Sequence, residues 1–198
     1  MSKSLPLFSV VIPTYNCLSF LRRAIQSVID QTDQNFEILV IDNASEDGTK
    51  EYLGSLKDPR IHSFEVQNYG VIALSRNIGI KNAKGSWICF LDADGIWYKE
   101  KLETCHKSID EKVDVIYHDL VKYGKINFLE RKILGSRQLK TPVLVDLLVD
   151  GNAINNSSAI VRRAMLKKIN YLDESPHMIA AEDYNAWLKI SEKTYQFL

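Results

Sequence analysis

Short apolar runs rich in β-branched residues alternate along this chain with amphipathic stretches at helical spacing. This alternation predicts an α/β fold with a mostly parallel central sheet flanked by helices, because each parallel strand needs a crossover to the next. The predicted strands cover residues 8–12, 36–41, 61–66, 86–91, 113–117 and 155–161. The predicted helices cover residues 18–29, 49–56, 71–83, 99–111, 142–149, 163–169 and 181–193. Residues 119–141 are basic and less periodic, and we interpret them as a hairpin or a flexible excursion.

Composition narrows the class of protein. The 198 residues have the length of one domain, and a hydrophobic fraction of 45% is enough for a core without disulfide or metal. Lys+Arg and Asp+Glu both count 25, and this balance argues against a nucleic-acid binder. The three cysteines lack metal-ligand spacing, which favours a reducing compartment. With no apolar run of membrane-spanning length, the expectation is a cytoplasmic globular protein.

Polar side chains gather at the predicted carboxyl ends of three strands. They are Thr14, Tyr15 and Asn16 after the first strand, Asp42 and Asn43 after the second, and Asp92 and Asp94 after the fourth. Any one of them could simply cap a loop or a helix. Ligands of open α/β sheets bind at this edge, however, so groups from three strands together predict a binding site there.

The pair Asp92 and Asp94 is the most informative local feature. If the strand continues through them, both carboxylates point to one side, and such a pair suits Mg²⁺ or Mn²⁺ together with phosphate oxygens. The chain has neither a P-loop nor a GxGxxG motif. A bound phosphate would therefore be held by a metal and by side chains, for which Arg76, Asn68 and Asn77 are the candidates.

Glu182 and Asp183 open the last predicted helix. Acidic residues at a helix start are favoured by the helix dipole, and this is a sufficient structural explanation. The functional alternative is a general base that takes a proton from a hydroxyl nucleophile. His177, in the preceding loop, is a candidate substrate contact.

Together these motifs resemble the family 2 glycosyltransferases, which have the GT-A fold. The resemblance extends from about Phe8 to the end of the chain. It is carried by VVIPTYN (10–16), VIDNASEDGT (40–49), NYG (68–70), SRNIG (75–79), Gly85, FLDAD (90–94) and ED (182–183). Several motifs in the same order and spacing make the resemblance much more specific than a single Asp-x-Asp.

The resemblance implies a role for each motif. The implied nucleotide contacts are Pro13, Thr14, Tyr15, Asp42, Asn68, Arg76, Asn77 and Asp92. Within that set, Asp42 accepts a hydrogen bond from the uracil imide. Asp94, with Asp92, is the implied ligand of a Mn²⁺ or Mg²⁺ ion that bridges the diphosphate. Asp183 is the implied catalytic base, and Glu182 supports it.

The implied reaction is an inverting transfer from a nucleotide sugar, a UDP-sugar, to a saccharide or lipid-linked saccharide in cell-surface polysaccharide synthesis. A lipid-linked acceptor would place the enzyme peripherally at the inner membrane face. The basic cluster Arg131, Lys132, Arg137 and Lys140 could contact anionic lipid there, or form a solvated loop.

The sequence departs from the family pattern in places. Asn43 and Gly95 stand where many relatives carry acidic residues, and the chain ends at Leu198, where relatives begin a further strand. We therefore expect a nucleotide-binding half over about 7–95 and an incomplete acceptor-side half over about 96–198. The alternative is a non-catalytic nucleotide-sugar-binding module or an inactive fragment. A sugar-1-phosphate nucleotidylyltransferase is disfavoured, because residues 13–16 replace its glycine-rich loop.

Overall fold

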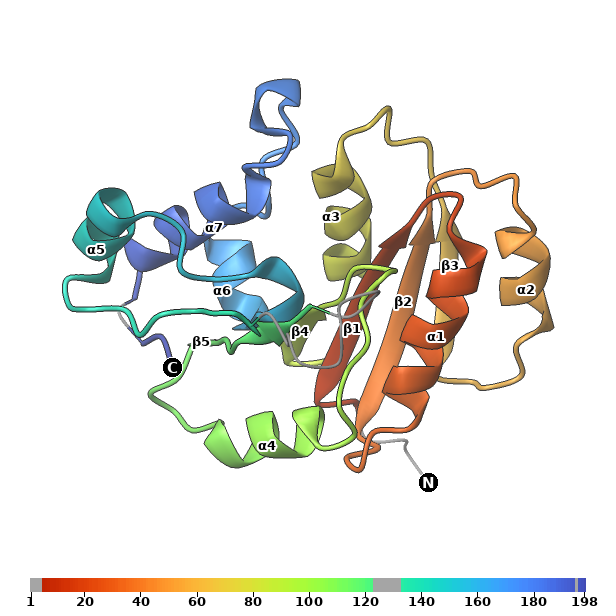
Figure 1. The fold of residues 1–198 in the computed structure, drawn as a ribbon, viewed down its shortest axis with the longest axis horizontal. Coiled ribbons are helices and arrows are strands. Elements are labelled where there is room, and N and C mark those ends of the chain that lie inside the picture. Colours follow the sequence, from red (N-terminus) through yellow and green to blue (C-terminus); the bar gives the residue numbers. More distant parts are fainter. Residues whose placement is uncertain (1–4, 123–132, 195) are drawn as a thin grey trace.

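A six-stranded sheet with the order β3-β2-β1-β4-β8-β5 forms the centre of the molecule (Figure 1). The computed structural model describes residues 5–122, 133–194 and 196–198. The strands of this sheet are β1 (Phe8–Thr14), β2 (Phe36–Asp42), β3 (Ile61–Glu65), β4 (Trp87–Phe90), β5 (Val115–Ile116) and β8 (Ile160–Arg162). The first four strands are parallel, whereas β8 runs antiparallel to both β4 and β5. The predicted mostly parallel α/β sheet is confirmed.

Helices cover both faces of the sheet. They are α1 (Leu18–Ile29), α2 (Thr49–Ser55), α3 (Ile72–Asn82), α4 (Lys101–Ser108), α5 (Val143–Asp150), α6 (Arg163–Lys168) and α7 (Glu182–Ser191), with the short 3₁₀ helices η1 (Asn156–Ser158) and η2 (Pro176–Met178). Helices α1, α2 and α4 pack on one face, and α3, α5, α6 and α7 contribute to the core of the other. In the described parts of the chain, no helix is long and apolar enough to cross a membrane.

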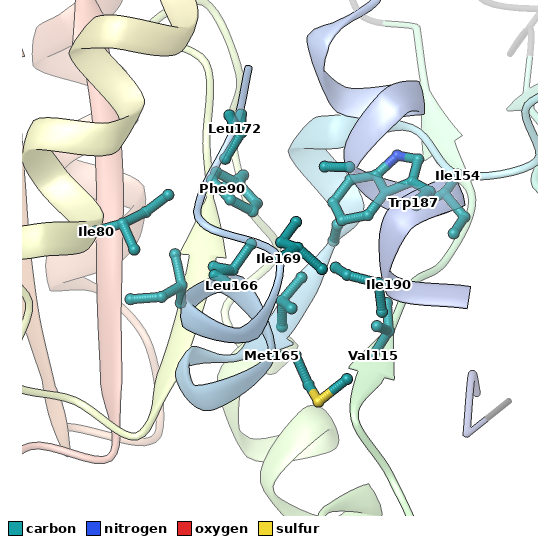
Figure 2. Close-up of a cluster of buried hydrophobic side chains, with 14 of the residues drawn as sticks. Ile80, Phe90, Val115, Ile154, Met165, Leu166, Ile169, Leu172, Trp187 and Ile190 are labelled. Carbon is teal, nitrogen blue, oxygen red and sulfur yellow. The ribbon is translucent and has the colours of Figure 1, made fainter. Parts of the chain in front are cut away.

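Alternation along the strands divides the core between the two faces. Val11 and Phe90 point to the face of α3 and α7, and their neighbours Val10 and Cys89 point to the face of α1 and α4. Figure 2 shows the first of these clusters, in which Trp187 of α7 lies among aliphatic side chains. The Trp187 ring meets Phe90 edge-on, with 6.2 Å between ring centroids. Trp187 is thus a packing residue.

Two details of the predicted elements are wrong. The first strand continues through Pro13 to Thr14. The carbonyl of Thr14 accepts a hydrogen bond from the N–H of Asn43 on the β2 side, so the backbone of Pro13 faces the β4 side. The pairing of β4 with β1 ends at Val11. No partner for an N–H at Pro13 is therefore needed, and the strand tolerates proline there. Residues 155–161 are not one strand, because η1 precedes β8.

The start of α1 also differs from the simplest expectation. Asn16 does not cap this helix; its side-chain oxygen instead accepts the backbone N–H of Glu46, 2.8 Å away. The carboxylate of Asp47 takes the capping role from the loop after β2, accepting the N–H of Leu18 at 2.7 Å. These two bonds tie together the loops that follow β1 and β2, at the edge where the site was predicted.

The basic segment contains a hairpin pairing. Strands β6 (Leu120–Val121) and β7 (Ile133–Leu134) pair antiparallel, which confirms the hairpin interpretation. Within the basic cluster, Arg131 and Lys132 lie outside the described residues, whereas Arg137 is paired with Asp146 and Lys140 lies 3.8 Å from Asp150. These two described cations are therefore already engaged by carboxylates of α5.

Candidate active site

The carboxyl ends of β2, β1 and β4 lie side by side. Thr14 and Asp42 are opposite each other in the β1–β2 register. Asp42 is buried, and its Oδ1 accepts the hydroxyl of Ser45 at 2.5 Å and the Ser45 N–H at 3.2 Å. Tyr15, the next residue after β1, is 60% exposed and free to contact a ligand at this edge. The convergence predicted from the strand ends is confirmed.

Asp92 and Asp94 lie in a turn and not in an extended strand. Strand β4 ends at Phe90, and the N–H of Gly95 donates to the carbonyl of Asp92 at 2.8 Å, which closes a four-residue turn. The expectation of two carboxylates aligned by strand alternation is therefore wrong: Asp92 is half-buried, whereas Asp94 is exposed. A Cβ at position 95 would lie 2.7 Å from Cδ1 of Leu91, so a larger residue there would require the Leu91 side chain to shift.

Arg76 connects the end of β4 to the start of α7. This buried side chain of α3 donates from one terminal nitrogen to Oδ1 of Asp92 at 2.9 Å, and from the other to Oε1 of Glu182 at 2.5 Å. Glu182 is also buried, with its side chain 7% exposed. One guanidinium thus compensates two carboxylates that come from distant parts of the chain.

Asp183 lies next to this ion pair in the first turn of α7. Burial raises the pKa of its carboxyl above the ordinary value, and the neighbouring Glu182 carboxylate adds to the increase. The N–H of Tyr184, which donates to Asp183 Oδ1 at 2.7 Å, lowers the pKa and so limits this rise. A carboxylate with a raised pKa is a stronger base, as deprotonation of a hydroxyl requires.

Two residues predicted to contact the nucleotide form hydrogen bonds within the protein. The Asn77 amide donates to the Leu172 carbonyl (2.9 Å) and to Glu174 (2.8 Å), and its oxygen accepts the Leu172 N–H (3.0 Å). The Asn68 amide donates to Ser75 at 2.8 Å and accepts a backbone N–H two residues later. Both side chains are buried. The structure therefore does not bring them to Asp92 as free ligand-binding groups.

Two residues outside the predicted set support the site. The Ser157 hydroxyl of η1 donates to Asp92 Oδ2 at 2.6 Å, and nothing in the run of small polar residues around it signals this contact. Lys101 of α4 donates to the carbonyls of Ser157 and Ser158, each at 3.3 Å. The sequence does indicate that Lys101 is buried, because this residue lies four residues before Cys105 on the apolar stripe of the helix. His177 is exposed in η2.

The carboxylates suit a hard divalent cation. Among the described residues, no group of three or more His, Cys, Asp and Glu side chains converges to hold a metal ion. Mg²⁺ and Mn²⁺ do not need such a group, because one or two carboxylates combined with phosphate oxygens are sufficient. Asp94 is exposed at the turn beside Asp92, and both supply oxygen donors. These residues fit a cation that arrives with a diphosphate.

A mostly parallel sheet covered by helices, with acidic groups at its carboxyl edge, defines the class of open α/β proteins whose ligands bind at that edge. The model of the family described as "Glycosyl transferase family 2" matches residues 9–179. The chain belongs to this family, and the resemblance seen in its motifs is confirmed.

Individual relatives agree with the family assignment. The chain is 30% identical over 190 residues to the UDP-Glc:alpha-D-GlcNAc-diphosphoundecaprenol beta-1,3-glucosyltransferase WfaP of Escherichia coli, covering 94% of this chain and 71% of that protein. Residues 1–349 of S. aureus TarS, solved in complex with UDP-GlcNAc, superpose with a TM-score of 0.73 and 25% identity over 96% of this chain. The mannosyltransferase PcManGT of Pyrobaculum calidifontis, in complex with GDP-Man and Mn²⁺, superposes with a TM-score of 0.71 and 19% identity over 99% of this chain.

These relatives establish the GT-A fold. The chain spans 54% and 55% of the two solved chains, and only 19% of some curated relatives.

Proposed function

We propose that this chain carries the donor site and the catalytic base of an inverting, metal-dependent glycosyltransferase. It would transfer a sugar from a nucleotide sugar, a UDP-sugar, to a hydroxyl of a saccharide or lipid-linked saccharide during cell-surface polysaccharide synthesis. The observation that carries this proposal is the position of Arg76, which joins Asp92 to Glu182. Through it, the strand-end acids and the helix start that bears Asp183 form a single site.

The donor half of the site is the edge formed by β2, β1 and β4. Asp42 is buried with its Oδ1 occupied by Ser45, which leaves Oδ2 to accept the imide N–H of a uracil. The exposed ring of Tyr15 offers a surface for the base, and Pro13 and Thr14 form the floor beneath it. We assign this half to residues of about 7–95, and the acceptor half to residues of about 96–198.

The chemistry follows from charge and proton position. Asp183 takes the proton of the acceptor hydroxyl as it attacks the anomeric carbon, and its burial makes it basic enough to do so. Asp92 and Asp94 would hold Mn²⁺ or Mg²⁺, which when bound stabilises the negative charge of the leaving diphosphate. The acceptor hydroxyl displaces the diphosphate in a single step, from the side opposite to this leaving group. The configuration at the anomeric carbon therefore inverts.

Isothermal titration with UDP, with and without Mn²⁺, tests the donor site. We expect binding that strengthens with Mn²⁺ in the wild type, and that loses this dependence in Asp94→Asn. The control is Asp110→Asn, which changes an exposed carboxylate in the loop after α4. Absence of metal-dependent UDP binding in the wild type would contradict the proposal. Binding without donor hydrolysis or transfer would instead identify a nucleotide-sugar-binding module.

The acceptor and the location are inferred from the named relative. The Escherichia coli protein carries a diphosphoundecaprenol-linked acceptor in its name, and a similar acceptor would place this enzyme peripherally at the inner membrane face. A thermal-shift screen of nucleotide sugars identifies the donor, because a ligand that binds the native state raises the unfolding temperature. The proposal expects a UDP-sugar to give the largest shift.

A further inference from the structure

The Ser157 hydroxyl contacts both the side chain and the backbone of Asp92. The Ser157 hydroxyl donates to Asp92 Oδ2 at 2.6 Å and accepts the backbone N–H of Asp92 at 3.1 Å. Since Oδ1 of Asp92 accepts from Arg76, both carboxylate oxygens have a fixed partner. This fixes the rotamer of Asp92 and the start of the turn that carries Asp94.

Lys101 holds the short helix η1, which bears Ser157. The Lys101 ammonium donates to the carbonyls of Ser157 and Ser158, and lies 4.3 Å from the centroid of the Trp97 ring. Lys101 is only 8% exposed. Burial lowers its pKa to about 8, so keeping the ammonium charged at this position costs free energy.

We propose that Ser157 is a positioning residue for Asp92, and that Lys101 fixes the turn from which Ser157 acts. This inference rests on the proposed function, in which Asp92 contacts the donor. With its two oxygens and its N–H held, Asp92 meets the metal and diphosphate without reorienting, so binding does not have to fix its rotamer. Neither residue is itself proposed to touch the substrate.

The first test measures positioning without any ligand. Ser157→Ala removes the acceptor of the Asp92 N–H, so we expect hydrogen exchange at the Asp92 amide to accelerate at least tenfold. Exchange at Leu91, whose N–H donates to Val11 O, stays unchanged as an internal reference. Ser108→Ala, which removes a hydroxyl bonded to a carbonyl at the end of α4, is the matched control. Unchanged exchange at Asp92 would overturn the proposal.

The second test links positioning to the donor. Ser157→Ala weakens Mn²⁺-dependent UDP binding by roughly tenfold, the loss typical of a hydrogen bond to a charged group. Ser157→Thr restores it, because the hydroxyl remains. In an Asp92→Asn background Ser157→Ala has much less effect, since Ser157 acts through Asp92. A full effect in that background, or unchanged UDP affinity in Ser157→Ala, would show that Ser157 does not position Asp92 for the donor.

Lys101 is tested in the same way. Lys101→Met reduces UDP affinity in the wild type and much less in Ser157→Ala, whereas the control Lys99→Met, an exposed change two residues earlier, leaves it unaltered. Additive losses would overturn the role of Lys101. If the wild type binds no UDP, the proposed function fails, and the amide exchange of Asp92 still decides the positioning claim.

Discussion

The residues at the site are held by ion pairs and hydrogen bonds that converge on Arg76. Arg76 faces Asp92 and Glu182 with its two terminal nitrogens, a geometry that the planar guanidinium satisfies and a lysine ammonium cannot. Asp183 lies beside these ion pairs, without a cation of its own among its hydrogen-bond partners in the described residues. Its burial therefore acts directly on its basicity.

Asp183→Asn should separate binding from chemistry. The amide keeps the size of the side chain but cannot take a proton, so UDP affinity stays near that of the wild type and transfer falls by about two to four orders of magnitude. Because the pKa of Asp183 is raised, the wild-type rate should decline on acidification at a higher pH than an ordinary aspartate would give. Initial rates across pH check both points, and near-normal turnover in Asp183→Asn would refute its role as the base.

Lys101 should give stability an unusual dependence on pH. Its pKa is about 8 in the folded protein against 10.5 for an ordinary lysine, so between these values only the unfolded chain holds the proton. Stability from this group therefore rises with pH across that window. Cys89, Cys105 and His118 face the ammonium and titrate themselves, so the measured quantity is the difference between the wild type and Lys101→Met.

That difference is obtained from urea unfolding at about pH 7.5 and about pH 9.5. It should move in favour of the wild type by about 2 kcal/mol, since one pKa unit corresponds to about 1.4 kcal/mol. A difference that stays constant over this range would show that Lys101 keeps its proton in the folded protein.

At the scale of elements, α3 is placed by its contact with the sheet. Gly79 faces β1 and β2, and a Cβ there would lie 2.5 Å from the Val11 side chain and 2.9 Å from that of Ile41. Arg76 lies one helical turn earlier, so the height of α3 above the sheet sets the reach of its guanidinium to Asp92.

Gly79→Ala should therefore destabilise the protein and weaken its site. We expect a loss of about 1–3 kcal/mol from overpacking, together with weaker UDP binding as α3 is pushed away from the sheet. Gly54→Ala in α2 is the control, because a Cβ there meets nothing within 4 Å and alanine favours the helix. Chemical denaturation of both variants checks the prediction. If Gly79→Ala is as stable as the wild type, the sheet accommodates the added methyl group and the prediction is wrong.

Elements were predictable from the sequence because periodicity reports burial directly. The runs that became β1, β2 and β4 are mostly apolar, and the polar residues that follow them had to lie at one edge. Periodicity says nothing about strand direction, so the antiparallel course of β8 was not predictable. Periodicity does not predict hydrogen-bond partners either. The Asn77 amide bonds to the carbonyl of Leu172, 95 residues away, and nothing in the local sequence distinguishes such a residue from one that contacts a ligand.

For the whole molecule, the sheet joins the two proposed halves into one folding unit. Val161 of β8 packs in the same cluster as Val11, and Ile160 packs in the opposite cluster with Cys89. Each face of the core thus contains residues from both halves. The proposed division near residue 95 would therefore separate functions and not independently stable domains.

Unfolding should consequently be a single transition. Urea curves followed by tryptophan fluorescence, which reports Trp87 on one face and Trp187 on the other, should coincide with curves followed by far-UV circular dichroism. A fragment of residues 1–95 should not fold cooperatively, because β4 would lose β8. Two separate transitions in the full chain would contradict this view.

The span of the Arg76 contacts has a consequence for the order of folding. The contact with Glu182 closes 106 residues of chain, and the contact between Asp92 and Ser157 closes 65. Closing such long loops costs entropy that is recovered only once β8 and α7 have docked on the sheet. We therefore expect the site to be among the last parts of the molecule to form during folding. A newly made chain with only β1 to β4 in place lacks the contacts of Glu182 and Ser157 that complete the proposed site, so donor binding is expected only once folding is complete.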